Sequence, residues 1–442
     1  MSVILPKEIN YAPPSALPEG TQCFSIVTTA SNASSFQASS IAQFDMVSRG
    51  YLVPESLVLR YRISVTGGAA ADVAQFMRGT PCYTPISRLE VLAGGGSQVI
   101  ESITNYNQLS NMLVNCKMNY AQKLGLANAF GYTSTVTGVY DFDLNTKLVN
   151  GSSMSTCTAA APVVQSFACP LGCILSNSDN LMPLQYLPGC RIQLTMESVQ
   201  NAFQISTTVA NQISNYTITN MELCYDIITF NPQVDQAISA RGNGFITIKS
   251  QSYSSAGSTL PIGSSGSLEY AFQQRVASLK SVFCHLSGTD STVFRNTMFD
   301  SIDATSSNGA YSFMIAGQQY PPRELSTILN KAGISMELSQ AFGPSHDLLT
   351  SNFSIHPTEF NVTNTGAATT QTVMGKFYVG VNTEKLSSNS VLLSGVSTQL
   401  SAISVRISLG TATTRQQVIQ LICLYDALLQ IDINNKTIQV MT

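Results

Sequence analysis

The sequence has 442 residues, of which 44 % are hydrophobic and only 11 % are charged, with a formal net charge of −3. A typical soluble domain has about 25 % charged residues, so the polar part of this chain is mainly Ser, Thr, Asn, Gln and Gly. Because hydrophobicity is ordinary and charge is low, the composition excludes a disordered chain, and the small net charge gives no electrostatic footprint for nucleic acid.

The first 20 residues are predicted to form an N-terminal arm. Their apolar stretch is short and meets Pro6 and Lys7 too early for a secretory signal. Lys7 is also the only basic residue before Arg49. No segment approaches the roughly 18 consecutive apolar residues of a transmembrane helix, so we expect no membrane span.

Beyond the arm, most segments alternate with a period of two, which is typical of β-strands. The segment 56–67 places its apolar residues on one face, namely Leu57, Leu59, Tyr61, Ile63 and Val65. Similar β-branched and aromatic segments, bounded by Gly, Pro, Asn or Ser, occur at 189–197, 215–230, 375–382, 402–410 and 417–433. The pattern predicts an all-β protein of the sandwich type.

Two segments break this rule and are predicted to be helices. The apolar residues of 98–115 follow a helical spacing. In 321–333, Pro321 and Pro322 suit the start of a helix and Gly333 its end. Long polar segments are predicted to be loops, at 66–80, 129–164, 251–268, 301–311 and 361–374.

The order of these segments indicates a tandem duplication. SLVLRYRISVTG, from Ser56, resembles SLKSVFCHLSG, from Ser278, and VLAGGG (91–96) resembles MIAGQQ (314–319). A Tyr-Asp pair closes each half, at 225–226 and at 425–426. We therefore predict two tandem eight-stranded jelly rolls, 21–235 and 236–442, each with a short inserted helix and long loops.

The three histidines occur in settings that favour structural roles. Ser345, His346 and Asp347 are consecutive, and such residues in an extended chain point to alternating sides instead of converging as a catalytic triad must. His285 directly follows Cys284, whereas a Cys–His nucleophile pair would be distant in sequence. His356 lies in loop-like sequence.

The ten cysteines are spread over the chain and are expected to be buried thiols. Cys169 and Cys173 are the closest pair and could serve a zinc site or a redox pair. A zinc site needs two further ligands, however, and Cys190 supplies only one.

Two further features carry weaker chemical interpretations. Asp141 and Asp143 share one strand face and could hold a cation at a subunit interface, although a solvated loop edge is the default. The glycine run 94–97 precedes a predicted helix but lacks the patterns of phosphate-binding loops, and is interpreted as a turn. We predict no catalytic, cofactor-binding or metal-binding residues.

Several segments resemble the double jelly-roll major capsid proteins of the tectivirus–adenovirus lineage. ISRLEVLAGGGSQVIESITNYNQLSNML (86–113) resembles the strand, glycine turn and helix of their first jelly roll, and 175–196 resembles a Pro-Leu turn leading into a strand. AYSFMIAGQQYPPREL (310–325) resembles their strand, short turn, Tyr-Pro and helix, and 423–440 resembles their last strand. The capsid proteins of polinton-like viruses and virophages are the most similar, but very large tower insertions are missing here.

The resemblance implies a viral structural protein without enzymatic activity or cofactors. Such proteins form homotrimers whose six jelly rolls make a pseudo-hexameric capsomer, and the capsomers tile an icosahedral shell. The implied partners are neighbouring capsomers, penton proteins, minor capsid or cement proteins and an internal membrane, with the Pro-rich segment 4–20 as a contacting arm. The implied location is the virion, after assembly inside the host cell. Because the arm is not basic, we expect no direct, sequence-specific nucleic-acid binding.

Two alternatives stay open on the sequence. A secreted or surface β-sandwich adhesin, or carbohydrate-binding protein, would need export. An enzyme on a jelly-roll scaffold, such as a cupin, would need clustered His and Glu ligands around a metal, and this chain has only three His.

Overall fold

The computed structural model describes most of the chain between Leu17 and Thr442. The described residues are 17–67, 72–73, 80–131, 149–150, 153–154, 156–157, 162–187, 189–203, 213–288, 299–300, 309–343, 355, 376–384, 393–413 and 416–442. Residues 1–16 of the expected arm, the expected loop 361–374 and most of the expected loops 66–80, 129–164 and 301–311 lie outside this set.

The first half of the chain folds into two main antiparallel sheets, one of six strands and one of four. One contains, in spatial order, β1 (Gln22–Thr29), β14 (Asn215–Thr229), β5 (Val58–Thr66) and β12 (Val163–Pro170), and β2 (Ser35–Gln37) and β4 (Tyr51–Leu52) also pair with β14. The other contains β3 (Ile41–Asp45), β13 (Arg191–Met196), β7 (Ile86–Ala93) and β8 (Gln98–Thr104). Short strands pair as β6 (Asp72–Val73) with β11 (Thr156–Cys157), and β9 (Val149–Asn150) with β10 (Ser153–Met154).

The second half repeats this arrangement. Its first sheet contains β15 (Phe245–Leu260), β23 (Gln417–Asp432) and β17 (Leu279–Gly288), with β18 (Phe299–Asp300) and β21 (Tyr378–Asn382) on the far edge of β17 and β24 (Thr437–Met441) on β23. Its second sheet contains β16 (Gly266–Phe272), β22 (Ile403–Leu409), β19 (Ala310–Ile315) and β20 (Gln318–Ser326).

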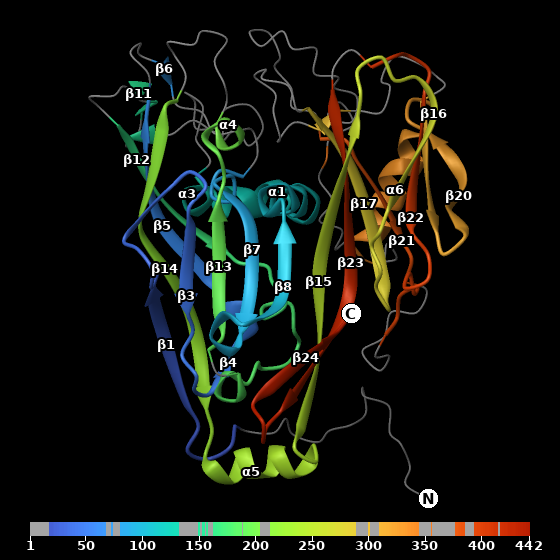
Figure 1. Cartoon of the computed structure of the whole chain (residues 1–442). Coiled ribbons are helices and arrows are strands. Elements are labelled where there is room, and N and C mark those ends of the chain that lie inside the picture. The colour runs from blue at the N-terminus through green and yellow to red at the C-terminus, as the bar shows by residue number, and fades with distance from the viewer. Residues whose placement is uncertain are drawn as a thin grey trace, which may run out of the picture.

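The two halves have the same topology. When the eight principal strands of each half are numbered in chain order, with β21 as the sixth of the second half, both halves have sheets ordered 1-8-3-6 and 2-7-4-5. This strand order is that of a jelly roll, and the two jelly rolls stand side by side (Figure 1). The predicted fold class is confirmed.

The predicted core alternation is also confirmed. Leu59, Tyr61, Ile63 and Val65 of β5 are buried, and so are Ile403, Val405, Ile407 and Leu409 of β22. A period of two places these side chains on one face of each strand, and that face packs into the sandwich.

Both helix predictions are corrected in the same way. The segment 98–115 begins with strand β8, and α1 covers only Tyr106–Lys117. The segment 321–333 begins within strand β20, and α6 covers Lys331–Ala341. In each half the strand after the glycine turn pairs back on the strand before it, and this hairpin pairing overrides the local helical spacing.

The predicted loop 251–268 is wrong. Residues 245–260 form β15, which pairs with β23 without interruption, and β16 begins at Gly266. Serines of this strand contact the first jelly roll, because Ser250 and Ser252 form hydrogen bonds to Ile174 and Glu101.

The described residues include four further α-helices. They are α2 (Tyr120–Gly125), α3 (Ala127–Phe130), α4 (Val199–Ala202) and α5 (Pro232–Arg241). Figure 1 shows α1 between the two jelly rolls and α5 bridging them at one end. The expected domain boundary at 235/236 falls inside α5. None of the helices in the described part of the chain is long and apolar enough to cross a membrane.

Candidate functional site

Cys284 and His285 are core residues on β17. Both are buried, and the ring of His285 meets that of Tyr378 edge-on, with 6.1 Å between ring centroids. Burial lowers the pKa of His285 to about 3 and raises the pKa of Cys284 to about 12. At neutral pH the imidazole is neutral and the thiol is protonated. Because consecutive strand residues point to opposite faces, the two groups are not arranged as nucleophile and base.

Cys169 and Cys173 are buried thiols as expected. Cys169 Sγ lies 3.8 Å from the Cys82 carbonyl oxygen, and burial raises the pKa of Cys173 to about 12. The expectation of buried thiols is wrong for Cys23, which is exposed, and for Cys224, which is half-buried. Among the described residues, no group of three or more His, Cys, Asp or Glu side chains is placed to hold a metal ion.

The other predicted features divide into one observed turn and several undescribed segments. Gly94–Gly96 form a tight turn with positive φ at all three glycines, and the Gly95 N–H donates to the Gly189 carbonyl oxygen at 3.2 Å. This turn leads into a strand and not into a helix. The segments containing Asp141 and Asp143, Ser345–Asp347 and His356 lie outside the described residues.

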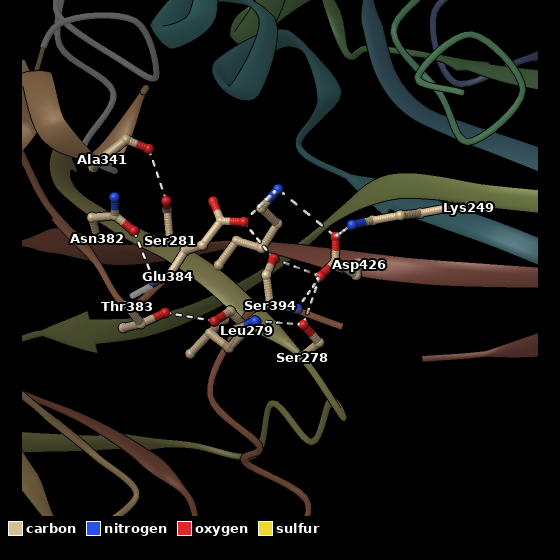
Figure 2. A network of polar contacts seen from close by, with 12 residues as sticks. Lys249, Ser278, Leu279, Ser281, Ala341, Asn382, Thr383, Glu384, Ser394 and Asp426 are labelled. Carbon is tan, nitrogen blue, oxygen red and sulfur yellow. Dashed lines mark hydrogen bonds and ion pairs between the residues drawn. The ribbon is translucent and has the colours of Figure 1, made fainter. Parts of the chain in front are cut away.

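Asp426, half of the repeated Tyr-Asp pair, lies at the centre of a buried polar network (Figure 2). The hydroxyl of Ser278 donates to Asp426 Oδ2 at 2.7 Å, and the Ser394 N–H donates to the same oxygen at 3.1 Å. Asp426 Oδ1 lies 3.8 Å from Nζ of both Lys249 and Lys280. The carboxylate on β23 therefore has cationic partners on β15 and β17.

A second carboxylate extends this network. Lys280 Nζ lies 3.3 Å from Glu384 Oε1, and the Ser394 hydroxyl also donates to Glu384. The Gly395 N–H donates to Ser278 Oγ at 2.8 Å. These contacts join β17, β23 and the segment 393–396. Since the carboxylates are ion-paired with the lysines and accept hydrogen bonds from Ser278 and Ser394, the network is suited to holding the sheet together.

The equivalent aspartate of the first half has a different environment. Asp226 is half-buried, accepts a hydrogen bond from Ser25 Oγ at 2.6 Å, and belongs to none of the ion pairs found in the described residues. Its N–H donates to Ser56 Oγ at 2.8 Å. The repeated serine and aspartate thus meet in both jelly rolls, but only the second pair is enclosed.

Glu101 is a buried carboxylate at the seam between the two jelly rolls. It lies on β8 of the first jelly roll, is 4 % exposed, and accepts hydrogen bonds from the Ile174 N–H at 2.7 Å and from the Ser252 hydroxyl of β15. Tyr425 of β23 donates to Ser252 Oγ at 3.2 Å. Burial outweighs these hydrogen bonds and raises the pKa of Glu101 to about 7.

The seam also covers the free edge of β15. The side chains of Asn177 and Ser178 donate to the main-chain oxygens of Gln251 and Lys249, at 3.1 and 3.3 Å. Ser250 Oγ donates to the Ile174 carbonyl oxygen at 2.6 Å. An uncovered sheet edge is a template for pairing with another chain, and here the first jelly roll covers it. Small hydroxyl side chains allow this close approach.

Strand β1 has the same position in the first jelly roll as β15 in the second, but no strand of the described part of the chain pairs with its outer edge. All eight of its residues pair with β14, and none of them is buried. Phe24 and Val27 are 36 % and 56 % exposed, and Arg49 stacks on the Phe24 ring at 5.0 Å. This surface, made of an unpaired strand edge with apolar side chains, is a candidate interface.

Sequence reasoning did not find Glu101, Lys249 or Lys280. The usable signal was the Ser-rich segment 249–258, because a strand whose side chains are mostly hydroxyls needs polar partners when it is buried. Asp426 was noticed only as part of the repeat.

The structure is similar to solved viral capsid proteins over nearly its whole length. PBCV-1 VP54, as fitted into a reconstruction of the virophage Sputnik, matches with a TM-score of 0.63 at 10 % identity, covering 98 % of this chain and 99 % of that chain. The Faustovirus major capsid protein matches with a TM-score of 0.62 at 11 % identity, covering 97 % and 93 %. The mavirus major capsid protein matches with a TM-score of 0.54 at 11 % identity, covering 100 % and 95 %.

These similarities are structural only. No protein-family model matches the sequence, and no curated protein matches it. At about one identical residue in ten, the matches establish the fold, and the resemblance drawn from the sequence is confirmed as a shared double jelly-roll fold.

Proposed function

We propose that this chain is a viral major capsid protein that assembles into homotrimeric, pseudo-hexameric capsomers. The observation that carries the capsid role is the double jelly-roll fold, shared from end to end with the Faustovirus and mavirus major capsid proteins. The buried network around Asp426 is consistent with a structural role, because its carboxylates are paired with lysines.

The trimer is supported by the contrast between two equivalent strands. The edge of β15 is covered at residues 249–251 by the first jelly roll of the same chain, whereas none of the described strands pairs with the outer edge of β1. If the second jelly roll of a neighbouring copy covers β1, the contact is head-to-tail, and such contacts close into a ring when the rotation allows it. A ring of three copies contains six jelly rolls.

The low charge supports extensive burial in an assembly. With 11 % charged residues, much of the surface is neutral and polar, and desolvating such groups against hydrogen-bonding partners costs less than desolvating charges. In this proposal the capsomers tile an icosahedral shell in the virion, after assembly in the host cell. They contact neighbouring capsomers, penton proteins and minor capsid or cement proteins.

Two finer parts of the proposal concern the ends of the domains. The jelly rolls divide within α5, and the N-terminal arm, residues 1–20, lies against a neighbour, a minor protein or an internal membrane. Genome contact is left to other components, because the arm contains a single basic residue, Lys7.

The decisive experiment is to purify the full chain and to measure its mass by mass photometry at micromolar concentration, with electron microscopy of any particles formed on expression. We expect a three-chain mass and six-lobed capsomers. A stable monomer that forms no larger assembly would contradict the proposal. Tight, salt-dependent DNA binding by the trimer would contradict its genome part alone.

A further inference from the structure

The network around Asp426 places an amine beside a buried carboxyl group. Lys280 Nζ lies 3.8 Å from Asp426 Oδ1, and the two side chains are 12 % and 0 % exposed. The pairing of β17 with β23 shifts its register between Leu279 and Ser281, and Lys280 is the extra residue at this shift. Beside it, the Asp426 N–H donates to the Ser278 carbonyl oxygen at 3.0 Å. The two strands therefore hold an amine and a carboxyl group together inside the protein.

The two oxygens of the Asp426 carboxyl group have different surroundings (Figure 2). Oδ2 accepts hydrogen bonds from the Ser278 hydroxyl at 2.7 Å and from the Ser394 N–H at 3.1 Å. Oδ1 is buried and accepts no hydrogen bond from the described residues. Donors that are fixed on one oxygen stabilise the negative charge that develops there when a nucleophile attacks the carboxyl carbon. Oδ1 is then the oxygen that can leave.

Glu384 supplies a base beside the amine. Its Oε1 lies 3.3 Å from Lys280 Nζ. The backbone fixes this position, because the Lys280 carbonyl oxygen accepts from the Thr383 N–H at 2.8 Å and from the Glu384 N–H at 3.2 Å. A proton that passes from Lys280 to Glu384 turns an ion pair into two neutral groups, and this change costs less in a buried site than in water. A neutral amine next to a base is the activated form of a lysine nucleophile.

The first jelly roll has the carboxylate but not the amine. In the repeated segments, Val58 stands where the second half has Lys280. Asp226, the counterpart of Asp426, is half-buried and belongs to none of the ion pairs found in the described residues. The chain therefore contains its own comparison, since only one of the two equivalent aspartates has a lysine and a base beside it.

From these contacts we propose that Lys280 and Asp426 form an isopeptide bond with each other after the chain has folded. The Lys280 nitrogen attacks Cγ of Asp426, and the new bond from nitrogen to Cγ replaces the bond from Cγ to Oδ1. The ammonium group gives up two protons, which leave with Oδ1 as one water molecule. Glu384 takes a proton from Nζ and returns it to Oδ1, so it ends unchanged. The reaction occurs once in each chain and needs no further reactant.

Lys249 is the competing amine. Its Nζ also lies 3.8 Å from Asp426 Oδ1, but its side chain is 26 % exposed, and the contact of Glu384 is with Lys280. The base therefore selects Lys280, while Lys249 keeps a positive charge beside the carboxyl group during the attack. The ion pairs described above are the state of the chain before the bond forms. The bond ties β17 to β23 and does not depend on the capsid role.

The test is the intact mass of the purified full chain, followed during prolonged incubation. We expect the mass to fall by that of one water molecule, in a fraction that rises with time. Lys280→Arg keeps a positive charge beside both carboxylates and should keep the full mass. Glu384→Gln should form the bond about a hundredfold more slowly, as for the loss of general acid–base catalysis. Lys436→Arg, at an exposed lysine, is the matched control and should lose water as the wild type does.

The position of the bond is read from the peptides of the digested protein. Tandem mass spectrometry of the wild type should find a branched peptide that joins Lys280 to Asp426, and none that contains Asp226. This measurement needs no variant, so it decides the proposal even where a substitution prevents folding. Circular dichroism shows whether each variant is folded.

The proposal is wrong if the wild-type chain keeps its full mass throughout the incubation. A branched peptide that joins Asp426 to Lys249, or Lys280 to Glu384, contradicts the assigned pair. Water lost within a single unbranched peptide places the reaction elsewhere in the chain. Equal rates for the wild type and for folded Glu384→Gln contradict the role of Glu384 as the base.

Discussion

Ser278 Oγ donates a hydrogen bond to Asp426 Oδ2 at 2.7 Å and so joins the start of β17 to the last long strand of the second jelly roll. The counterparts in the first jelly roll, Ser56 and Asp226, also meet, through a 2.8 Å hydrogen bond from the Asp226 N–H to Ser56 Oγ. A serine–aspartate contact between the start of the third principal strand and the last principal strand is therefore present in both jelly rolls. Only in the second copy is the carboxylate fully enclosed with two lysines.

Asp426→Asn should destabilise the protein strongly. The substitution removes the buried charge of Asp426 that faces Lys249 and Lys280, although Lys280 keeps its ion pair with Glu384. Removing one partner of a buried ion pair typically costs about 3–5 kcal/mol. We expect a loss towards the lower end, because Lys249 is 26 % exposed and is partly solvated. The measurement is the free energy of unfolding in urea.

Asp226→Asn is the matched control for that variant. Asp226 is half-buried and belongs to none of the ion pairs found in the described residues, so we expect a loss below about 1 kcal/mol. Equal losses for the two variants would show that enclosure of Asp426 does not distinguish the two jelly rolls.

Glu101→Gln should remove a pH dependence of stability. The carboxyl has a pKa of about 7 in the folded protein, against an ordinary value of 4.5, so the folded state holds a proton that the unfolded state has released. The stability from this group is greatest below about pH 4.5, falls as the pH rises towards 7, and is constant above. The shift corresponds to roughly 3 kcal/mol at most.

The measurement compares unfolding free energies between pH 4.5 and 8 for the wild-type protein, for Glu101→Gln and for Glu55→Gln, whose residue is exposed. We expect Glu101→Gln to lack the fall and to be more stable than the wild type at pH 8. If the unfolding free energies of the wild-type protein and of Glu101→Gln change with pH in parallel, the Glu101 carboxyl is not protonated in the folded protein.

His285→Phe should act at the opposite end of the pH range. The folded pKa of about 3 lies below the ordinary 6.5, so the unfolded state takes up a proton first. Stability from the neutral imidazole is complete above about pH 6.5 and is lost as the pH falls towards 3. Phenylalanine retains an aromatic ring beside Tyr378. We expect the variant to lose less stability than the wild type between pH 7 and 4 in urea titrations, and an equal loss would refute this role.

Val27→Lys should weaken self-association without unfolding the chain. Val27 is 56 % exposed on the open strand β1, and lysine on an edge strand opposes pairing with another chain. We expect the three-chain mass to give way to single chains in mass photometry, with an unchanged unfolding midpoint at low concentration. Ile262→Lys, at a residue 66 % exposed between β15 and β16, should leave the mass unchanged. If the Val27→Lys variant still shows the three-chain mass, the interface lies elsewhere and not on β1.

Several elements could be predicted from the sequence because their cause is local. The alternation in β5 and β22 follows from the pleat of a strand, and the repeated segments at Ser56 and Ser278 disclosed the duplication. The two predicted helices begin one strand too early. Residues 98–104 and 321–326 have helical spacing locally, but they pair as hairpins with the strands before them. Hairpin register is a property of two segments and cannot be read from one.

By itself the sequence determined the all-β class, the two tandem jelly rolls and the low surface charge, because turn residues, strand alternation and composition act within a few residues. Only the tertiary structure decided which copy of a repeated feature is buried. Glu101 and Ser252 are 151 residues apart, and Asp426 differs from Asp226 because the network around it includes Lys249, Lys280 and Ser394 from three other segments. Burial depends on surfaces that the rest of the chain brings together, so identical motifs can become a half-exposed edge in one jelly roll and an enclosed ion network in the other.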